Sequence, residues 1–399
     1  MNTTKLFDQL VYCAVLAIAI STPFTKGAIE TSLLLGIGAF FYLKILKKEF
    51  NPNEIPLIFP LILYLVAIEL SMMNNPNLGL TGKGLIKTLK HIAVYLIAVE
   101  TVRTEKRFVW ILRIILFAAF LSCWNGFYQR ISGWDFRHCY PLIIVRGVTR
   151  VAGSFNHPNN FAAYLATVIL ISLYSRDHFF WQVAKYFYVP FYFGALFLTN
   201  SRMPLIFMIV SLALSIFISK KFRQFSVHYF LIAIGCCVLY FVFKPSYFIR
   251  LLDVMKGDGR LQYWIYSVEL AKQRPFLGSG INSFMNIYAN YPPTFRYGPG
   301  RFIYAHNFIL QMWVEIGLLG LCSFFYFLKK YFSLITDFLR HKDDAVVSQS
   351  VFGLLVGIVF FLLHSLVDND MQSLQLSTFF WLLIGCTIGI SRQNDRPKA

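Results

Sequence analysis

Long apolar stretches, separated by shorter polar links, recur along the whole chain. A helix needs roughly 20 mainly apolar residues to cross about 30 Å of hydrocarbon, and about twelve stretches approach that length. Their approximate limits are 7 to 24, 28 to 46, 55 to 73, 86 to 102, 107 to 127, 158 to 175, 180 to 198, 203 to 219, 227 to 243, 306 to 328, 347 to 365 and 373 to 390. The pattern predicts an all-α polytopic membrane protein whose residues 1–399 form a single transmembrane domain.

Clusters of lysine and arginine alternate with these spans and indicate how the chain is oriented. They include Lys44/Lys47/Lys48, Arg103/Lys106/Arg107, Arg176, Lys220/Lys221/Arg223, Lys329/Lys330/Arg340/Lys342 and Arg392/Arg396/Lys398. All of these clusters fall on one side when the spans alternate, and the positive-inside rule makes that side cytoplasmic. We therefore expect both termini in the cytoplasm.

Two long basic segments, residues 128–157 and 244–305, fall on the opposite side and depart from this rule. The second, a predicted periplasmic loop between the ninth and tenth spans, carries eight Lys and Arg side chains against three acids. Long loops cross membranes regardless of charge, so one interpretation is a solvated basic loop near anionic headgroups. The other is an anion site that forms part of an active site. Within this loop we predict a helix from Gly259-Arg260 to Gln273, ended by Pro275, and a shorter helix between 283 and 291.

Composition agrees with the membrane prediction and narrows the partners. The chain is 57% hydrophobic and 14% charged, which is more apolar surface than one soluble core can bury. The net charge of +18 lies largely in clusters between spans, so we expect the lipid bilayer, and no nucleic acid, as a partner. The seven cysteines show neither metal-site spacing nor a disulfide framework, so no metal site is expected.

His306 and Asn307 stand at the predicted outer start of the tenth span. A neutral imidazole can take a proton from a hydroxyl near pH 7, which makes His306 a candidate base. The alternative is an interfacial histidine that is hydrogen-bonded to a loop carbonyl. Glu315 lies deep in the same span, where a carboxylate is costly and should face the bundle interior, either to partner an arginine or to fix a helix. Gly317 and Gly320 are small positions that would let this helix pack closely.

Two arginines stand at predicted helix starts on the same side. Arg202 follows Ser201 at the junction of the seventh and eighth spans, and Arg260 follows Gly259 in the long loop. Helix N-termini present free N–H groups, and an arginine beside them can add a bidentate clamp for phosphate. Each could instead be a surface or interface arginine that extends its charge into water. Because topology places both at one membrane face with His306, we interpret the three together as an anion site with a base.

Several short motifs at this face together resemble the O-antigen ligase superfamily, which also holds O-antigen polymerases and protein O-oligosaccharyltransferases. They are His306-Asn307 followed after nine residues by Gly317 and then Gly320, the Thr199-x-Ser201-Arg202 junction, Gly259-Arg260, Gly153-Ser-Phe-Asn-His157-Pro158-Asn159, and Leu366-Val-Asp368. The resemblance covers roughly residues 150 to 370. The spacing of the His-Asn motif is its most specific part.

The resemblance implies a GT-C-like helical bundle in the bacterial inner membrane. Such enzymes move O-antigen glycan from undecaprenyl diphosphate to a sugar hydroxyl of lipid A-core at the periplasmic face, without metal or other cofactor. By motif, His306 is expected to be the catalytic base, and Arg202 and Arg260 are expected to bind the donor diphosphate. Supporting roles are expected for Asn307, Ser201, Arg146, Arg150, His157, Glu315 and Asp368, with Arg146 and Arg150 as candidates for acceptor contacts.

These roles predict a single displacement that inverts the anomeric centre, because no nucleophile of the protein is then required. Two alternatives stay open. A polymerase of the same superfamily would use a second glycan as acceptor, whereas a polyprenyl-glycan transporter would bind substrate near the midplane between inverted repeats, and no repeat is found. Protein O-oligosaccharyltransferases usually carry an extra C-terminal domain, whereas this sequence stops at Ala399, soon after its last predicted span. We therefore expect a ligase rather than a member of that branch.

Overall fold

The computed structural model describes residues 3–47, 55–145, 147–176, 179–243, 260–289, 304–342 and 344–392, and the structural statements below concern these residues. The helices are α1 (Thr3–Ser21), α2 (Lys26–Lys47), α3 (Ile58–Met72), α4 (Leu78–Thr101), α5 (Glu105–Ser132), α6 (Pro158–Tyr174), α7 (Phe179–Leu198), α8 (Arg202–Ile218), α9 (Arg223–Phe243), α11 (Arg260–Gln273), α12 (Phe284–Ala289), α13 (Phe308–His341), α14 (Ala345–His364) and α15 (Leu374–Ser391). The shorter elements are the strands β1 (Ile143–Val145) and β2 (Val148–Arg150) and the 3₁₀ turns η2 (Lys220–Phe222) and η5 (Asp370–Gln372).

Each predicted span coincides with one helix of the structure, and the all-α polytopic prediction is confirmed. Among the described residues, seven helices are long and apolar enough to cross a membrane, and three shorter ones are also apolar. The predicted loop helix is α11, with the expected start and end, and α12 is the shorter helix that follows it. Residues 244–259 and 290–303 of the predicted loop, and Arg146, lie outside the described residues.

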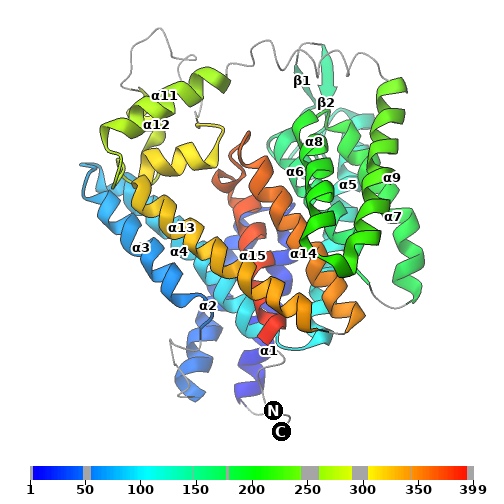
Figure 1. The fold of residues 1–399 in the computed structure, drawn as a ribbon, viewed down its shortest axis with the longest axis horizontal. Helices are drawn as coiled ribbons and strands as arrows, with labels where there is room; N and C mark the ends of the chain where they lie inside the picture. Colours follow the sequence, from blue (N-terminus) through cyan, green and yellow to red (C-terminus); the bar gives the residue numbers. More distant parts are fainter. Residues whose placement is uncertain are drawn as a thin grey trace.

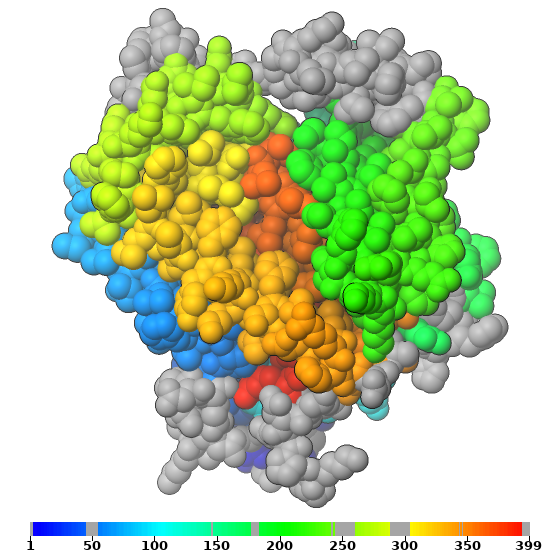
Figure 2. Space-filling view, viewed as in Figure 1, coloured from blue at the N-terminus to red at the C-terminus, as the bar shows by residue number. Residues whose placement is uncertain are grey.

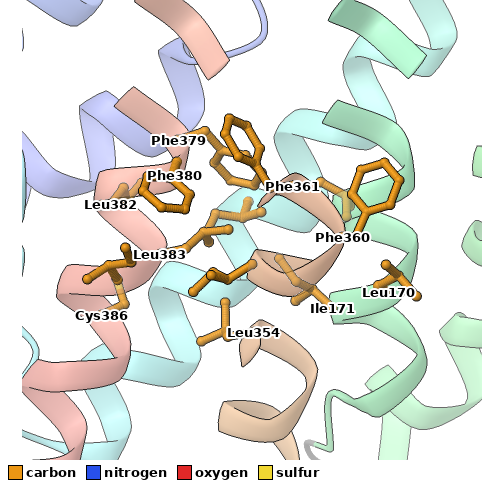
Figure 3. Packing of buried hydrophobic residues seen from close by; sticks show 14 of the residues in the cluster. Leu170, Ile171, Leu354, Phe360, Phe361, Phe379, Phe380, Leu382, Leu383 and Cys386 are labelled. Atoms are coloured by element: carbon orange, nitrogen blue, oxygen red, sulfur yellow. The ribbon is translucent and has the colours of Figure 1, made fainter. Parts of the chain in front are cut away.

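The core of the bundle lies around α15, because 89% of the residues of this helix are buried. This helix packs against α4 and α14, and α14 packs against α6. Figure 3 shows Phe379 and Phe380 of α15 beside Phe361 of α14, with Leu170 and Ile171 of α6 on the other side. The Phe361 and Phe380 rings stack with centroids 5.0 Å apart. Two densely packed helices therefore hold the connection that runs from Ser365 to Ser373.

The two ends of the bundle differ in what they carry (Figure 1). The start of α1 and the end of α15 lie at one end. At the other end lie α11, α12, the β1–β2 hairpin and the connection between α14 and α15. In Figure 2 this orange-red connection lies at the surface between the yellow start of α13 and the green α8. The segments that carry the candidate chemistry are thus gathered at one end of the molecule.

The 34-residue helix α13 is broken at Gly317, whose φ of 67° and ψ of −174° are not helical. Backbone groups of residues 275–280 pair with those of residues 314–319 by four hydrogen bonds of 2.8–3.1 Å. These bonds satisfy polar groups that the break removes from the helical ladder. A Cβ at position 317 would lie 2.2 Å from the carbonyl oxygen of Phe276. Gly317 therefore lets residues 275–280 approach the backbone of α13. From the sequence, Gly317 was expected to allow close packing between helices instead.

Candidate active site at the start of α13

His306 and Asn307 immediately precede α13, as predicted. The Asn307 side chain accepts a hydrogen bond from the backbone N–H of Leu310 at 3.1 Å and caps the helix. His306 has a φ of 49°, in the left-handed region that few residues other than glycine adopt. Its Nδ1 lies 3.3 Å from Oδ1 of Asp368, and its side chain is 36% exposed. The imidazole is therefore held on one side and open to solvent on the other.

Asp368 is the group that orients this imidazole. Burial raises the pKa of the Asp368 carboxyl, but the hydrogen bond from His306 and nearby positive charges, including Arg260, outweigh burial and hold the pKa well below its usual range. An ionised carboxylate accepts a hydrogen bond from Nδ1–H, which keeps the proton on Nδ1 and leaves Nε2 as the basic nitrogen of His306. This arrangement suits the removal of a proton from a hydroxyl group.

A hydrogen-bond network connects Asp368 to two other sequence motifs. Its Oδ2 accepts a bond from Nδ2 of Asn159 at 2.8 Å. Oδ1 of Asn159 accepts bonds from the Arg150 guanidinium at 2.6 Å and from the Ser201 hydroxyl at 3.0 Å. Arg150 and Ser201 are themselves 2.7 Å apart. The structure thus brings together Arg150, Ser201, His306 and Asp368, each expected at the site from the sequence, around Asn159, which the sequence marked only as the last residue of a motif.

Arg150 also joins the β-hairpin to the α7–α8 junction. Its Nε donates to the carbonyl oxygen of Thr199 at 3.0 Å. In the reverse direction, Nδ2 of Asn200 donates to the carbonyl oxygen of Thr149 at 2.6 Å. With its guanidinium committed to these partners, Arg150 fixes the junction at which α8 begins. A direct acceptor contact for this side chain stays a prediction.

The two arginines expected at helix starts are found there. Arg202 is the first residue of α8 and Arg260 the first residue of α11, and both side chains are half-buried. The charge of Arg260 contributes to the lowered pKa of Asp368, so this arginine lies near that carboxyl. His157 caps α6, because its Nδ1 accepts the backbone N–H of Asn159 at 3.2 Å. Its supporting role in the site stays a prediction.

Glu315 fixes the entry of the loop into α13. Its carboxylate accepts the backbone N–H groups of Asn282 at 3.0 Å and Phe284 at 3.3 Å, at the start of α12. It also accepts the Gln311 side-chain amide at 2.8 Å. Of the two roles considered for Glu315, these contacts favour the fixing of a helix.

Gln311 was missed in the sequence, although it connects Glu315 to the site. Its Oε1 accepts the backbone N–H of Ala305 at 3.0 Å and the Asn369 side-chain amide at 3.1 Å. These contacts place Gln311 between the residues next to His306 and Asp368. The signal was available, because positions 307, 311 and 315 repeat every four residues and form a polar stripe on an otherwise apolar helix.

A cavity of about 630 Å³ opens beside His306. His157, Asn159, His306 and Asp368 line one part of it. The helices α2 and α4 contribute four lysines to its wall, Lys26, Lys83, Lys87 and Lys90. The sequence did not point to these lysines, because Lys26 and Lys83 fall in predicted links and Lys87 and Lys90 fall in a predicted apolar span.

A second His–Asp pair joins the last residue of α14 to the connection that carries Asp368. Nδ1 of His364 is 2.6 Å from Oδ2 of Asp370, and both side chains are only 1% exposed. Breaking such a buried pair from one side leaves an uncompensated polar group and costs several kcal/mol, roughly 3–5. The pair therefore fixes the turn that presents Asp368, and it was not predicted from the sequence.

The fold and this site define a helical membrane protein in which a histidine is paired with a carboxylate beside a lysine-lined cavity at one end. Residues 187–325 match the family model described as O-antigen ligase, which confirms the resemblance predicted from the motifs. A Rickettsia conorii protein described as a candidate polysaccharide ligase is 26% identical over 129 residues, which cover 31% of this chain and 30% of that protein. The similarity thus spans less than a third of either chain, and it supports a ligase- or polymerase-like role in polysaccharide assembly.

The matched segment contains only part of the site. Of the residues predicted for the site, Arg202, Arg260 and His306 lie within residues 187–325. Asn159 and Asp368, which orient the histidine through the network, lie outside it, as do the lysines of the cavity. The structure therefore completes the site with residues that the family match does not reach.

Proposed function

We propose that the protein is an O-antigen ligase-type glycosyltransferase. Its donor is a glycan on undecaprenyl diphosphate, and its acceptor is a sugar hydroxyl of lipid A-core. The reaction takes place at the periplasmic face of the bacterial inner membrane. The observation that carries this proposal is His306, oriented by Asp368 and exposed beside a cavity large enough for sugar rings.

In the proposed reaction Nε2 of His306 takes the proton of the acceptor hydroxyl. The acceptor oxygen then forms a bond to the anomeric carbon while the bond from that carbon to the diphosphate oxygen breaks. The diphosphate leaves with the electron pair, and Arg202 and Arg260 stabilise its negative charge. Because the acceptor attacks from the face opposite the diphosphate, the anomeric configuration inverts in a single displacement.

A reconstitution with purified protein tests this function. The protein in lipid nanodiscs receives undecaprenyl-diphosphate glycan together with lipid A-core, and the product is identified by mass spectrometry and by NMR of the new linkage. We expect glycosylated lipid A-core with inverted configuration, and a loss of roughly 10²–10⁴ in turnover with His306→Ala. Retention of configuration, or a trapped glycosyl-protein adduct, would rule out the displacement.

The same assay separates the ligase from the polymerase. The family match is compatible with both roles, so a parallel reaction contains donor molecules without lipid A-core. Chain extension of one donor by another would identify a polymerase and would overturn the ligase proposal. Donor movement between leaflets without any new glycosidic bond would instead indicate a transporter.

A further inference from the structure

The lysines of the cavity share one face of α4. Lys83, Lys87 and Lys90 are spaced by four and then three residues, which places them on the same side of a helix. Lys26, at the start of α2, lines the same cavity. The site that contains His306 therefore has a basic wall built by helices outside the segment that matches the family.

Lysines outnumber carboxylates among the described residues that line the cavity. Its lining contains Glu30 and Asp368 as the only acids among the described residues. Glu30 is paired with Lys90 at 2.6 Å, and Asp368 is paired with His306. No described carboxylate forms an ion pair with Lys26 or Lys83, and both of these side chains are exposed. Like charges one helical turn apart repel each other, and a bound anion would relieve that repulsion.

Lys87 is held in place within this wall. Its Nζ donates to the carbonyl oxygen of Gln372 at 2.8 Å and lies 3.2 Å from the Gln372 side-chain oxygen. Gln372 belongs to the same connection as Asp368. The basic wall and the carboxylate that orients His306 are thus fixed to one segment, which gives them a defined relative position.

We propose that Lys26, Lys83 and Lys87 bind an anionic group, a phosphate or a carboxylate, on the acceptor saccharide. This inference rests on the proposed glycosyl transfer and adds the chemical class of its acceptor. In a single displacement the base stands beside the acceptor, and the leaving diphosphate stands on the other side of the anomeric carbon. His306 lines the same cavity as the lysines, whereas Arg202 and Arg260, assigned to the diphosphate, are not among its lining residues. The lysines therefore fit the acceptor.

A charge-removing double variant tests this assignment. Lys26→Gln combined with Lys83→Gln removes two charges and breaks no ion pair within the described residues. The matched control, Lys220→Gln with Lys329→Gln, removes two exposed lysines from the opposite end of the bundle. Two acceptors are compared in nanodiscs, a core-type oligosaccharide that carries one phosphate and the same oligosaccharide without it.

We expect the double variant to raise KM for the phosphorylated acceptor about tenfold, because a hydrogen bond to a charged group contributes that much to binding. Its kcat and its KM for the donor should stay within about twofold of wild type. With the uncharged acceptor, wild type, variant and control should be alike. Equal KM values for the phosphorylated acceptor in all three proteins would overturn the proposal. A rise confined to the donor KM would assign the lysines to the diphosphate and would overturn it as well.

Binding without donor distinguishes this inference from the proposed function. The equilibrium Kd of each fluorescently labelled oligosaccharide is measured on the same purified proteins. Phosphate-dependent binding that the double variant loses would support the basic wall even if no transfer is detected, in which case the proposed function alone fails. Transfer without any phosphate dependence of Kd or KM would support the proposed glycosyl transfer and would contradict the proposal that the lysines bind an anionic group of the acceptor. Lys83→Arg, which keeps the charge, should restore most of the affinity lost in Lys83→Gln.

Discussion

At the scale of single residues, the contact between His306 and Asp368 leads to the most direct prediction. Asp368→Asn keeps the shape of the side chain but removes the charge that holds the proton on Nδ1, so Nε2 no longer acts reliably as a base. We expect kcat to fall by roughly 10²–10⁴, the range over which general-base help acts. Donor binding should be unchanged, since the arginines are untouched. The exposed Asp337→Asn is the matched control, and near-normal kcat in Asp368→Asn would contradict the orienting role.

The same carboxylate predicts a pH dependence of stability. The pKa of Asp368 is lowered in the folded protein, so its interactions stabilise the fold above the unfolded value of about 3.9 and are lost as pH falls toward the folded value. We expect the difference in Tm between wild type and Asp368→Asn to be constant from about pH 7 to pH 5 and to shrink below about pH 4. Thermal unfolding in detergent across this range measures it. A difference that grew as the pH fell would contradict the assigned direction.

The arginines at the helix starts make a separate prediction. Arg202→Lys and Arg260→Lys each keep a positive charge but lose the planar fork that binds two phosphate oxygens at once. We expect each variant to lose about tenfold or more in kcat/KM for the donor, the loss that follows when a charge-assisted hydrogen bond is removed. Arg340→Lys, an exposed position on α13, serves as the control. Wild-type kinetics in both lysine variants would remove the clamp from the mechanism.

The role of a residue could be predicted from the sequence only where its type and its spacing from neighbouring residues indicate that role. His306 and Asn307 stood out as a His-Asn pair at the outer start of a span, and Asp368 stood out through the motif Leu366-Val-Asp368. Gln311 did not stand out, and Asn159 appeared only as the last residue of a motif, because their roles depend on partners far away in the sequence. The lysines of α4 look like an ordinary link until the fold places them in the cavity with His306.

At the scale of elements, the break in α13 makes the next prediction. Gly317 has a backbone conformation that is essentially restricted to glycine, and a Cβ there would meet the carbonyl oxygen of Phe276. We expect Gly317→Ala to destabilise the protein by about 1–3 kcal/mol or more, with loss of activity because the loop is displaced. Gly38→Ala in α2, where a Cβ meets nothing within 4 Å, should be neutral. Equal Tm values for the two variants in thermal unfolding would show that the break tolerates a side chain.

The positions of the spans followed from their apolar lengths, whereas some of their ends did not. Helix α4 begins at Leu78, eight residues before the predicted 86, because its first turns carry the lysines that line the cavity and lower the apolar average. Helix α13 continues to His341, whereas the predicted span ends at 328. The prediction stopped there because the last turns of the helix carry basic residues, which end the apolar stretch. A hydropathy window detects the part of a helix that suits lipid, and these polar extensions are helical for other reasons. The backbone pairing of residues 275–280 with α13 has no local sequence pattern at all.

At the scale of the whole molecule, the described ends of α1 and α15 lie at one end of the bundle and the site lies at the other (Figure 1). The alternation of basic clusters predicts that the site end is periplasmic. Lys272 on α11 and Asp337 near the end of α13 are both exposed and mark the two ends.

In a cysteine-free variant that retains transfer activity, Lys272→Cys should react with a membrane-impermeant maleimide in intact spheroplasts. Asp337→Cys should react only after permeabilisation, because the membrane shields the cytoplasmic end. The cysteine-free parent reports background labelling, and denatured samples of each variant confirm that both cysteines can react. The reverse labelling pattern would place His306 and the lysine-lined cavity in the cytoplasm. A lipid-linked glycan presented at the periplasmic face could not then be the donor, so the orientation decides which pool of substrate the site can use.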